Sequence, residues 1–194
     1  CLEGLRGALK LLYDLIDSPD LVHEAMRQVR SLFARIYEEF LGYGDKDRWG
    51  TTCALPFYSR GRFNRIQSDF ICLLNPDLFR RFVLPAIEEE ARLFEHSCFH
   101  LDGPGALVHL DDLLAIPQLH AIQWVPGAGN PPQLAWPELL HRIQAAGKAI
   151  ILHVSADEAR AAHRLYRPER VVYDVSVGSI AEGEALLAWL KAHT

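Results

Sequence analysis

The sequence contains no apolar run long enough to cross a membrane and no long run of basic residues. The longest apolar stretches, such as residues 149–152, fall far short of the roughly 20 residues that a membrane-spanning helix needs. The formal net charge is -5, whereas binding to nucleic acid phosphates requires clustered lysine and arginine. We therefore expect neither a membrane nor a nucleic acid as a partner.

Cysteine is scarce and scattered along the chain. The four cysteines, Cys1, Cys53, Cys72 and Cys98, include no Cys-x-x-Cys pair. This spacing argues against a disulfide framework and against a zinc finger, and it is typical of a protein in the reducing cytoplasm. No signal-peptide pattern follows Cys1, so we expect the sequence to begin inside a longer chain.

No glycine-rich dinucleotide fingerprint follows any predicted strand, but the second half of the sequence has a regular rhythm. Short apolar segments alternate with segments of helical period, and two of the helices begin with the capping-box spacing Ser-x-x-Glu. This alternation predicts parallel β-α-β units. The predicted strands cover residues 98–101, 121–125, 148–154 and 170–175, and the predicted helices cover 110–116, 137–146, 156–165 and 180–192.

The first half carries fewer signals. Ser18 can cap a long helix that Gly42 ends. Residues 53–58 predict a strand or an extended segment. A second helix is expected over residues 75–93, and Pro85 is expected to kink or divide it.

Two architectures suit this order of elements, an open doubly wound sheet and a closed barrel. We count about five strands, whereas a complete eight-unit barrel needs roughly 200 to 400 residues. The absence of a dinucleotide fingerprint lowers the case for the open sheet. We therefore predict an α/β fold, a partial (β/α)8 TIM barrel, with residues 1–194 as the C-terminal portion of a single barrel domain. Alone, such a part-barrel is expected to be inactive and to aggregate through its unpaired sheet edges.

Polar residues gather at the predicted ends of the strands, where parallel β/α folds place their chemistry. His100 and Asp102 lie two residues apart and so share one side of an extended chain. They predict a metal-ligand pair or an acid/base pair. The alternative is that His100 bonds to the turn that follows and Asp102 caps the next segment.

Asp69 and Gln67 follow a stretch that we expect to be a loop and that carries several arginines, among them Arg65. Arg65 can bind a substrate carboxylate or phosphate, and Asp69 can act as a base or as an anchor for the substrate. Gln67 is predicted to bind the substrate. The alternative for these residues is a solvated surface loop.

Further substrate contacts are predicted at the ends of the later strands. Gln123 and Trp124 end one of them, and Trp124 can form a wall over a flat substrate. Equally, Trp124 can pack against the neighbouring helix. His153 and Asp174 are predicted to contact the substrate, with helix capping as the alternative.

The chain resembles the uroporphyrinogen decarboxylase superfamily, a group of β/α barrels that includes haem-pathway decarboxylases and corrinoid- or folate-linked methyltransferases. The segments that carry the resemblance are RFNRIQSDF at 62–70, NPDLF at 75–79, FHLDGPG at 99–105 and AIQWVPG at 121–127. They cover nearly the whole chain and only the later portion of a family member.

This resemblance favours methyl transfer over decarboxylation. The family's late Asn-Leu-Gly-His-Gly type signature is absent, and residues 173–179 read YDVSVGS instead. The family's zinc methyltransferases bind the metal through a His-x-Cys pair and a later cysteine. Here His100 keeps the histidine, and Asp102 stands where the first cysteine is expected.

The resemblance implies the following reaction and partners. A small-molecule substrate and a separate corrinoid protein are expected at the same barrel face, with zinc held by His100 and Asp102. A decarboxylase, which would need no cofactor, and a non-catalytic binding barrel remain as alternatives. A homodimer is left open.

Overall fold

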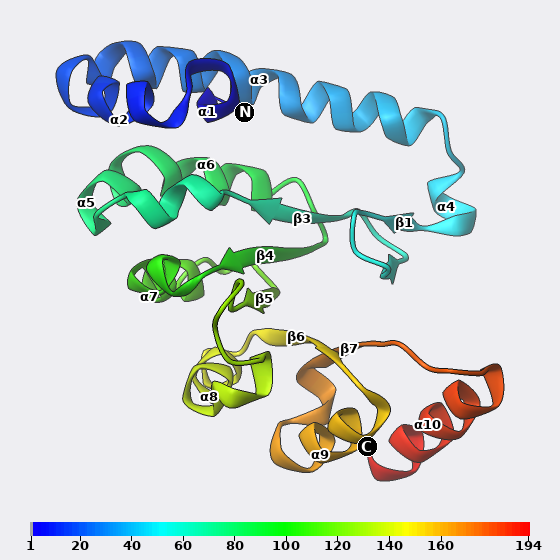
Figure 1. The fold of residues 1–194 in the computed structure, drawn as a ribbon. Coiled ribbons are helices and arrows are strands. Elements are labelled where there is room, and N and C mark those ends of the chain that lie inside the picture. Colours follow the sequence, from blue (N-terminus) through cyan, green and yellow to red (C-terminus); the bar gives the residue numbers. More distant parts are fainter. Residues whose placement is uncertain (1) are drawn as a thin grey trace.

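A computed structural model describes residues 2–194, so Cys1 lies outside the described chain. Its centre is a five-stranded sheet in which every neighbouring pair is parallel and the spatial order follows the chain order (Figure 1). The strands of this sheet are β3 (Phe63–Gln67), β4 (His96–Asp102), β5 (Ala121–Val125), β6 (Ala149–Val154) and β7 (Val171–Val175).

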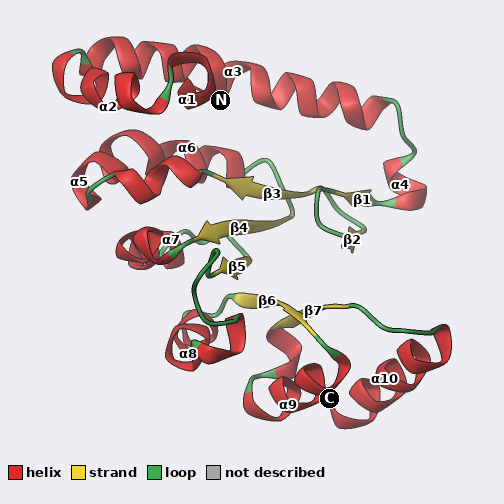
Figure 2. Ribbon diagram, viewed as in Figure 1, coloured by secondary structure: helices red, strands yellow, loops and turns green. Residues whose placement is uncertain are grey.

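Helices precede, connect and follow these strands (Figure 2). The helices before the sheet are α1 (Leu2–Arg6), α2 (Ala8–Asp17), α3 (Pro19–Gly42) and α4 (Lys46–Trp49). The connecting and final helices are α5 (Pro76–Leu78), α6 (Leu84–Ala91), α7 (Leu110–Leu114), α8 (Pro137–Ala145), α9 (Ala156–Leu165) and α10 (Ile180–His193). A two-stranded antiparallel ribbon, β1 (Thr51–Thr52) with β2 (Tyr58–Ser59), stands before β3.

The sequential strand order places the connecting helices on one face of the sheet. Crossovers between parallel strands are right-handed, so a sheet that always adds its next strand on the same side keeps its helices together. The core agrees, because Phe99, Ile122 and Leu152 pack in one cluster with helix residues such as Leu113 and Ile143. The chain is thus an α/β protein with an all-parallel sheet flanked by helices, and this arrangement is compatible with part of an α/β barrel.

The opposite face, which we call the inner face, differs from one end of the strands to the other. Near the start of the strands it is apolar, and Phe63, Cys98 and Ile151 pack there against Leu55 of the β1–β2 connection. Towards the strand ends it is polar. Gln67, His100 and Gln123 are cross-strand partners in the register of β3, β4 and β5.

Several local predictions are confirmed. The long helix begins directly after Ser18, although the Ser18 side chain makes no capping hydrogen bond. Both halves of the capping box form at Ser155 and Glu158. In the second box Ser179 accepts from the Glu182 amide, but the Glu182 carboxylate accepts from the amide of Gly178. The helix predicted at 75–93 is helical from Pro76 to Ala91, and a π-helical segment, Phe79–Val83, interrupts its α-helical geometry just before Pro85.

Two predictions for the first half are wrong. Of residues 53–58, predicted as a strand or an extended segment, only Tyr58 lies in a strand, β2, and residues 53–57 form the connection between β1 and β2. The expected arginine-bearing loop contains β3, the first strand of the parallel sheet. Period-two alternation is absent from β3, because its two apolar residues, Phe63 and Ile66, lie on opposite faces of the sheet. Within residues 2–194, no helix has both the length and the apolar character needed to span a bilayer.

Candidate functional site

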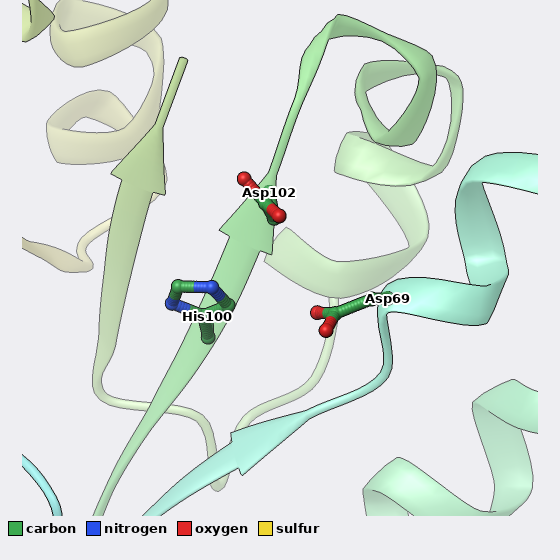
Figure 3. Close-up of side chains that lie close together, drawn as sticks. All are labelled: Asp69, His100 and Asp102. Atoms are coloured by element: carbon green, nitrogen blue, oxygen red, sulfur yellow. The ribbon is translucent and has the colours of Figure 1, made fainter. Parts of the chain in front are cut away.

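Three side chains with ligand atoms meet at the C-terminal ends of β3 and β4 (Figure 3). Asp69, His100 and Asp102 each offer one nitrogen or oxygen atom, and these atoms all lie within 4.8 Å of one another. His100 and Asp102 are half-buried, and Asp69 is exposed. The structure thus brings together the three residues that the sequence predicts as catalytic.

The local fold explains why these three residues meet. His100 and Asp102 alternate with Leu101 along β4, so both project from the inner face while Leu101 is buried in the core with the helices. Gln67, the last residue of β3, is the register partner of His100. Asp69 follows two residues later, as the first residue of the 3₁₀ turn Asp69–Leu73, and therefore arrives beside the end of β4.

The His100 ring is held by the neighbouring strand. Its Nδ1 atom lies 2.8 Å from Oε1 of Gln123 on β5. A carbonyl oxygen can only accept a hydrogen bond, so Nδ1 carries the proton and donates it. Nε2 is then the atom with the free lone pair, which is the form that binds a metal ion or takes up a proton.

The Asp69 carboxylate is oriented in a similar way. Nε2 of Gln67 donates to its two oxygens at 3.0 and 2.8 Å. Gln67 and Gln123 therefore hold cluster members from the flanking strands, and neither contributes a charge of its own. Both were predicted as substrate-binding residues, and the contacts in the structure give each a role in positioning the cluster.

A thiol that the sequence analysis does not select lies beside the cluster. Cys72 is exposed, and its Sγ donates to the backbone oxygen of Asp102 at 3.1 Å. Burial raises the pKa of the Cys72 thiol above its ordinary value, and the negative charges of Asp102 and Asp69 raise it further. The signal in the sequence is the spacing Asp-x-x-Cys, which becomes informative only when this segment is known to be a 3₁₀ turn.

His153 and Asp174 form a separate pair on the same face. They are register partners on β6 and β7, and Nδ1 of His153 lies 3.2 Å from Oδ2 of Asp174. The His153 side chain is 71% exposed. The predicted group of strand-end residues is therefore divided into the cluster and this pair.

Trp124 is a correction. The indole is 0% exposed and packs edge-on against Trp136, with 5.2 Å between ring centroids. It follows Gln123 directly, and successive residues of a strand point to opposite faces, so Trp124 lies on the helix side of the sheet. The interpretation as a wall over a substrate is wrong, and packing against the neighbouring helical segment is correct.

The arginines of the β3 region have different surroundings. Arg65 is half-buried on the inner face as the register partner of Cys98, and its proposed contact with a substrate stays a prediction. Arg62 forms an ion pair with Glu38, 2.6 Å away, on the preceding long helix.

Gln133 is a positioning residue that the sequence does not reveal. Its Nε2 donates to the backbone oxygens of Trp124 and Ile151, and its Oε1 accepts from the His153 amide at 2.7 Å. The side chain thereby joins the ends of β5 and β6 beyond their last direct register pair and fixes the backbone at His153.

Comparisons with protein families, with curated proteins and with solved structures find no match for this chain. The chemistry of the site therefore rests on its own residues. One imidazole nitrogen and two carboxylate oxygens are a donor set that suits zinc and other first-row divalent ions. The oriented His100 tautomer fits the same role, because a metal-binding histidine usually donates its other N–H to a fixed acceptor.

Proposed function

We propose that this chain is part of a β/α-barrel enzyme of the uroporphyrinogen decarboxylase-like type. In this proposal Asp69, His100 and Asp102 bind a divalent metal ion, and zinc is the preferred candidate. The observation that carries the proposal is the 4.8 Å cluster of ligand atoms at the ends of two adjacent parallel strands. In characterised β/α-barrel enzymes the active site lies at the carboxyl ends of the strands.

The sheet supports the barrel part of the proposal. Five parallel strands in chain order, with their connecting helices on one face, are what a segment of a β/α barrel contains. The inner face carries the cluster, the His153–Asp174 pair and Arg65, so all of them would face the interior of a closed barrel.

Methyl transfer to or from a corrinoid carrier is the reaction we propose. A bound metal ion would supply Lewis acidity towards the group that gives or receives the methyl. Gln123 keeps the proton on Nδ1 of His100 and so leaves Nε2 free to bind. Gln67 fixes the Asp69 carboxylate. Arg65, His153 and Asp174 are proposed to contact the substrate from the same face.

Metal binding tests this proposal. It is measured on the full chain, meaning the longer protein to which residues 1–194 are proposed to belong, because these residues alone are expected to aggregate. Calorimetric titration with Zn²⁺ should give one site per chain. His100→Ala should abolish binding, and Asp69→Asn and Asp102→Asn should weaken it, because each removes a donor. His141→Ala, which removes an exposed histidine of α8, is the matched control and should bind as the original chain does.

The alternatives give different results. A decarboxylase would bind no zinc and would turn over uroporphyrinogen in the full-length protein. A non-catalytic binding barrel would catalyse neither methyl transfer nor decarboxylation, and its ligand binding would be unchanged by His100→Ala. Zinc binding that His100→Ala leaves intact would contradict the proposed site directly.

A further inference from the structure

Two short 3₁₀ segments pack against each other beside the polar end of the sheet. The first, Asp69–Leu73, follows β3 and begins with a residue of the cluster. The second, Pro104–His109, follows β4, whose last residue is Asp102. The position of Asp69 relative to Asp102 therefore depends on how these two segments are joined.

The side chain of His109 joins the two segments. Its Nε2 atom lies 3.0 Å from the backbone oxygen of Ile71. A carbonyl oxygen can only accept a hydrogen bond, so Nε2 carries the proton and donates it. The Ile71 oxygen also accepts from the Leu74 amide at 3.0 Å, and His109 therefore occupies its second acceptor position. The bond ties a carbonyl two residues after Asp69 to the segment that follows Asp102.

The surroundings of the His109 ring are apolar. The residue is 0% exposed, and its ring stacks on Phe79 with 4.2 Å between ring centroids. Within residues 2–194, no hydrogen-bond partner meets its Nδ1 atom. A buried nitrogen without a partner costs free energy, and a phenylalanine would stack on Phe79 without that cost. Packing alone therefore does not account for an imidazole here, whereas the bond from Nε2 to Ile71 does.

Few other contacts fix Asp69 relative to Asp102. Asp69 is exposed, and the hydrogen bonds from Gln67 orient its carboxylate from β3, the strand that precedes it. A second contact crosses from the turn to the end of β4, where the Cys72 thiol donates to the Asp102 backbone oxygen at 3.1 Å. A thiol is a weak donor, and this one is exposed. The buried N–H of His109 is therefore the stronger link between the two segments.

We infer that His109 is a positioning residue of the metal site and holds Asp69 at the distance from His100 and Asp102 that one ion requires. This inference rests on the proposed metal site and deepens it. Bonds from zinc to nitrogen and oxygen ligands are confined to roughly 2.0–2.2 Å, so a small displacement of the turn removes Asp69 from the ion. His109 itself does not contact the ion and acts through Asp69.

Calorimetric titration of the full chain with Zn²⁺ tests this inference on two variants. His109→Phe keeps a ring that can stack on Phe79 and removes the donor, so Zn²⁺ affinity should fall by about 10-fold. His109→Gln returns an N–H of similar reach and should restore most of the affinity. Ile151→Ala, which shortens a buried side chain at the other end of the inner face, is the control for lost stability and should bind Zn²⁺ as the original chain does.

A double-mutant cycle separates positioning from general stability. In the Asp69→Ala background His109→Phe should weaken Zn²⁺ binding no further, because the donor through which His109 acts is already absent. In the Asp102→Ala background His109→Phe should cost the same factor of about 10 as in the original chain. A merely structural role would lower the affinity equally in both backgrounds.

Thermal unfolding of the metal-free variants shows whether each is folded. If His109→Phe does not fold, His109→Met, which also lacks the donor and adapts its shape to the space, takes its place. Unchanged Zn²⁺ affinity in a folded variant without the donor, or equal losses in the two backgrounds, would overturn the role of His109 and leave the proposed metal site standing. No binding of Zn²⁺ by the original full chain would overturn both.

Discussion

The two ends of the inner face are built from the same strands, but one end is apolar and the other is polar. Near the start of the strands the face is apolar and closed by the connection that carries Leu55. Near the end the same face presents His100, Asp102 and Gln123. Side chains on one face of a strand recur every second residue, so Cys98 and His100 are neighbours on the inner face of β4. Cys98 packs in the apolar cluster, whereas His100 belongs to the candidate metal site. The fold therefore restricts the site to one rim.

The largest contrast between the two ends is expected in thiol chemistry. Burial raises the pKa of Cys98 to about 12, so the reactive thiolate form of Cys98 is scarce at pH 8. Cys98 is also 1% exposed, whereas Cys72 is exposed. In the native chain at pH 8, iodoacetamide should label Cys72 at least about 100-fold faster than Cys98.

Peptide mass spectrometry at timed intervals measures both labelling rates. Equal labelling of the two cysteines would contradict the contrast between the ends.

Shortening a buried side chain at the apolar end of the inner face should lower the stability of the protein and leave metal binding at the site unchanged. Ile151 is 4% exposed on the inner face, so Ile151→Ala should lower the free energy of unfolding by about 2–5 kcal/mol through lost burial and an internal cavity. Zinc affinity, measured below the unfolding transition, should not change. Urea denaturation gives the first quantity and calorimetry the second, and loss of zinc binding in the folded variant would show that the two ends are coupled.

Removal of a positioning amide at the polar end should have the reverse effect. Gln123→Leu leaves Nδ1 of His100 without its acceptor, so zinc affinity should fall by about 10–100-fold. Gln123→Glu keeps an acceptor and should restore most of the affinity. Unchanged zinc affinity in Gln123→Leu would contradict the role assigned to the amide.

The smallest effect is expected at the His153–Asp174 pair. Nδ1 of His153 lies 3.2 Å from Oδ2 of Asp174, and the His153 side chain is 71% exposed, so solvent limits the contribution of the pair to at most about 1 kcal/mol. Asp174→Asn should therefore change the unfolding free energy by less than about 1 kcal/mol and leave zinc binding intact. A larger loss of stability would show that this pair stabilises the C-terminal ends of β6 and β7, contrary to this prediction.

The later strands were predictable because each is a short apolar run between clear helix signals. β3 was not predictable, because Phe63 and Ile66 lie on opposite faces and polar residues fill the positions around them. Its burial depends on contacts with β4 and with the β1–β2 connection, and these contacts are distant in sequence.

The site was predictable in part for the same reason. His100 and Asp102 share a face through their spacing alone, and the structure confirms this arrangement. Trp124 was assigned to the site because it ends a strand, but its odd distance from Gln123 places it on the other face. Gln133 and Cys72 act through backbone contacts with distant strands, and these contacts leave no pattern in the sequence.

A crystal structure of the full chain grown with Zn²⁺ would show whether the ion binds at Asp69, His100 and Asp102. One anomalous zinc peak is expected, at roughly 2.0–2.2 Å from Nε2 of His100 and from one oxygen each of Asp69 and Asp102. A zinc peak at other residues, or no peak at this rim under saturating Zn²⁺, would rule out the proposed metal site.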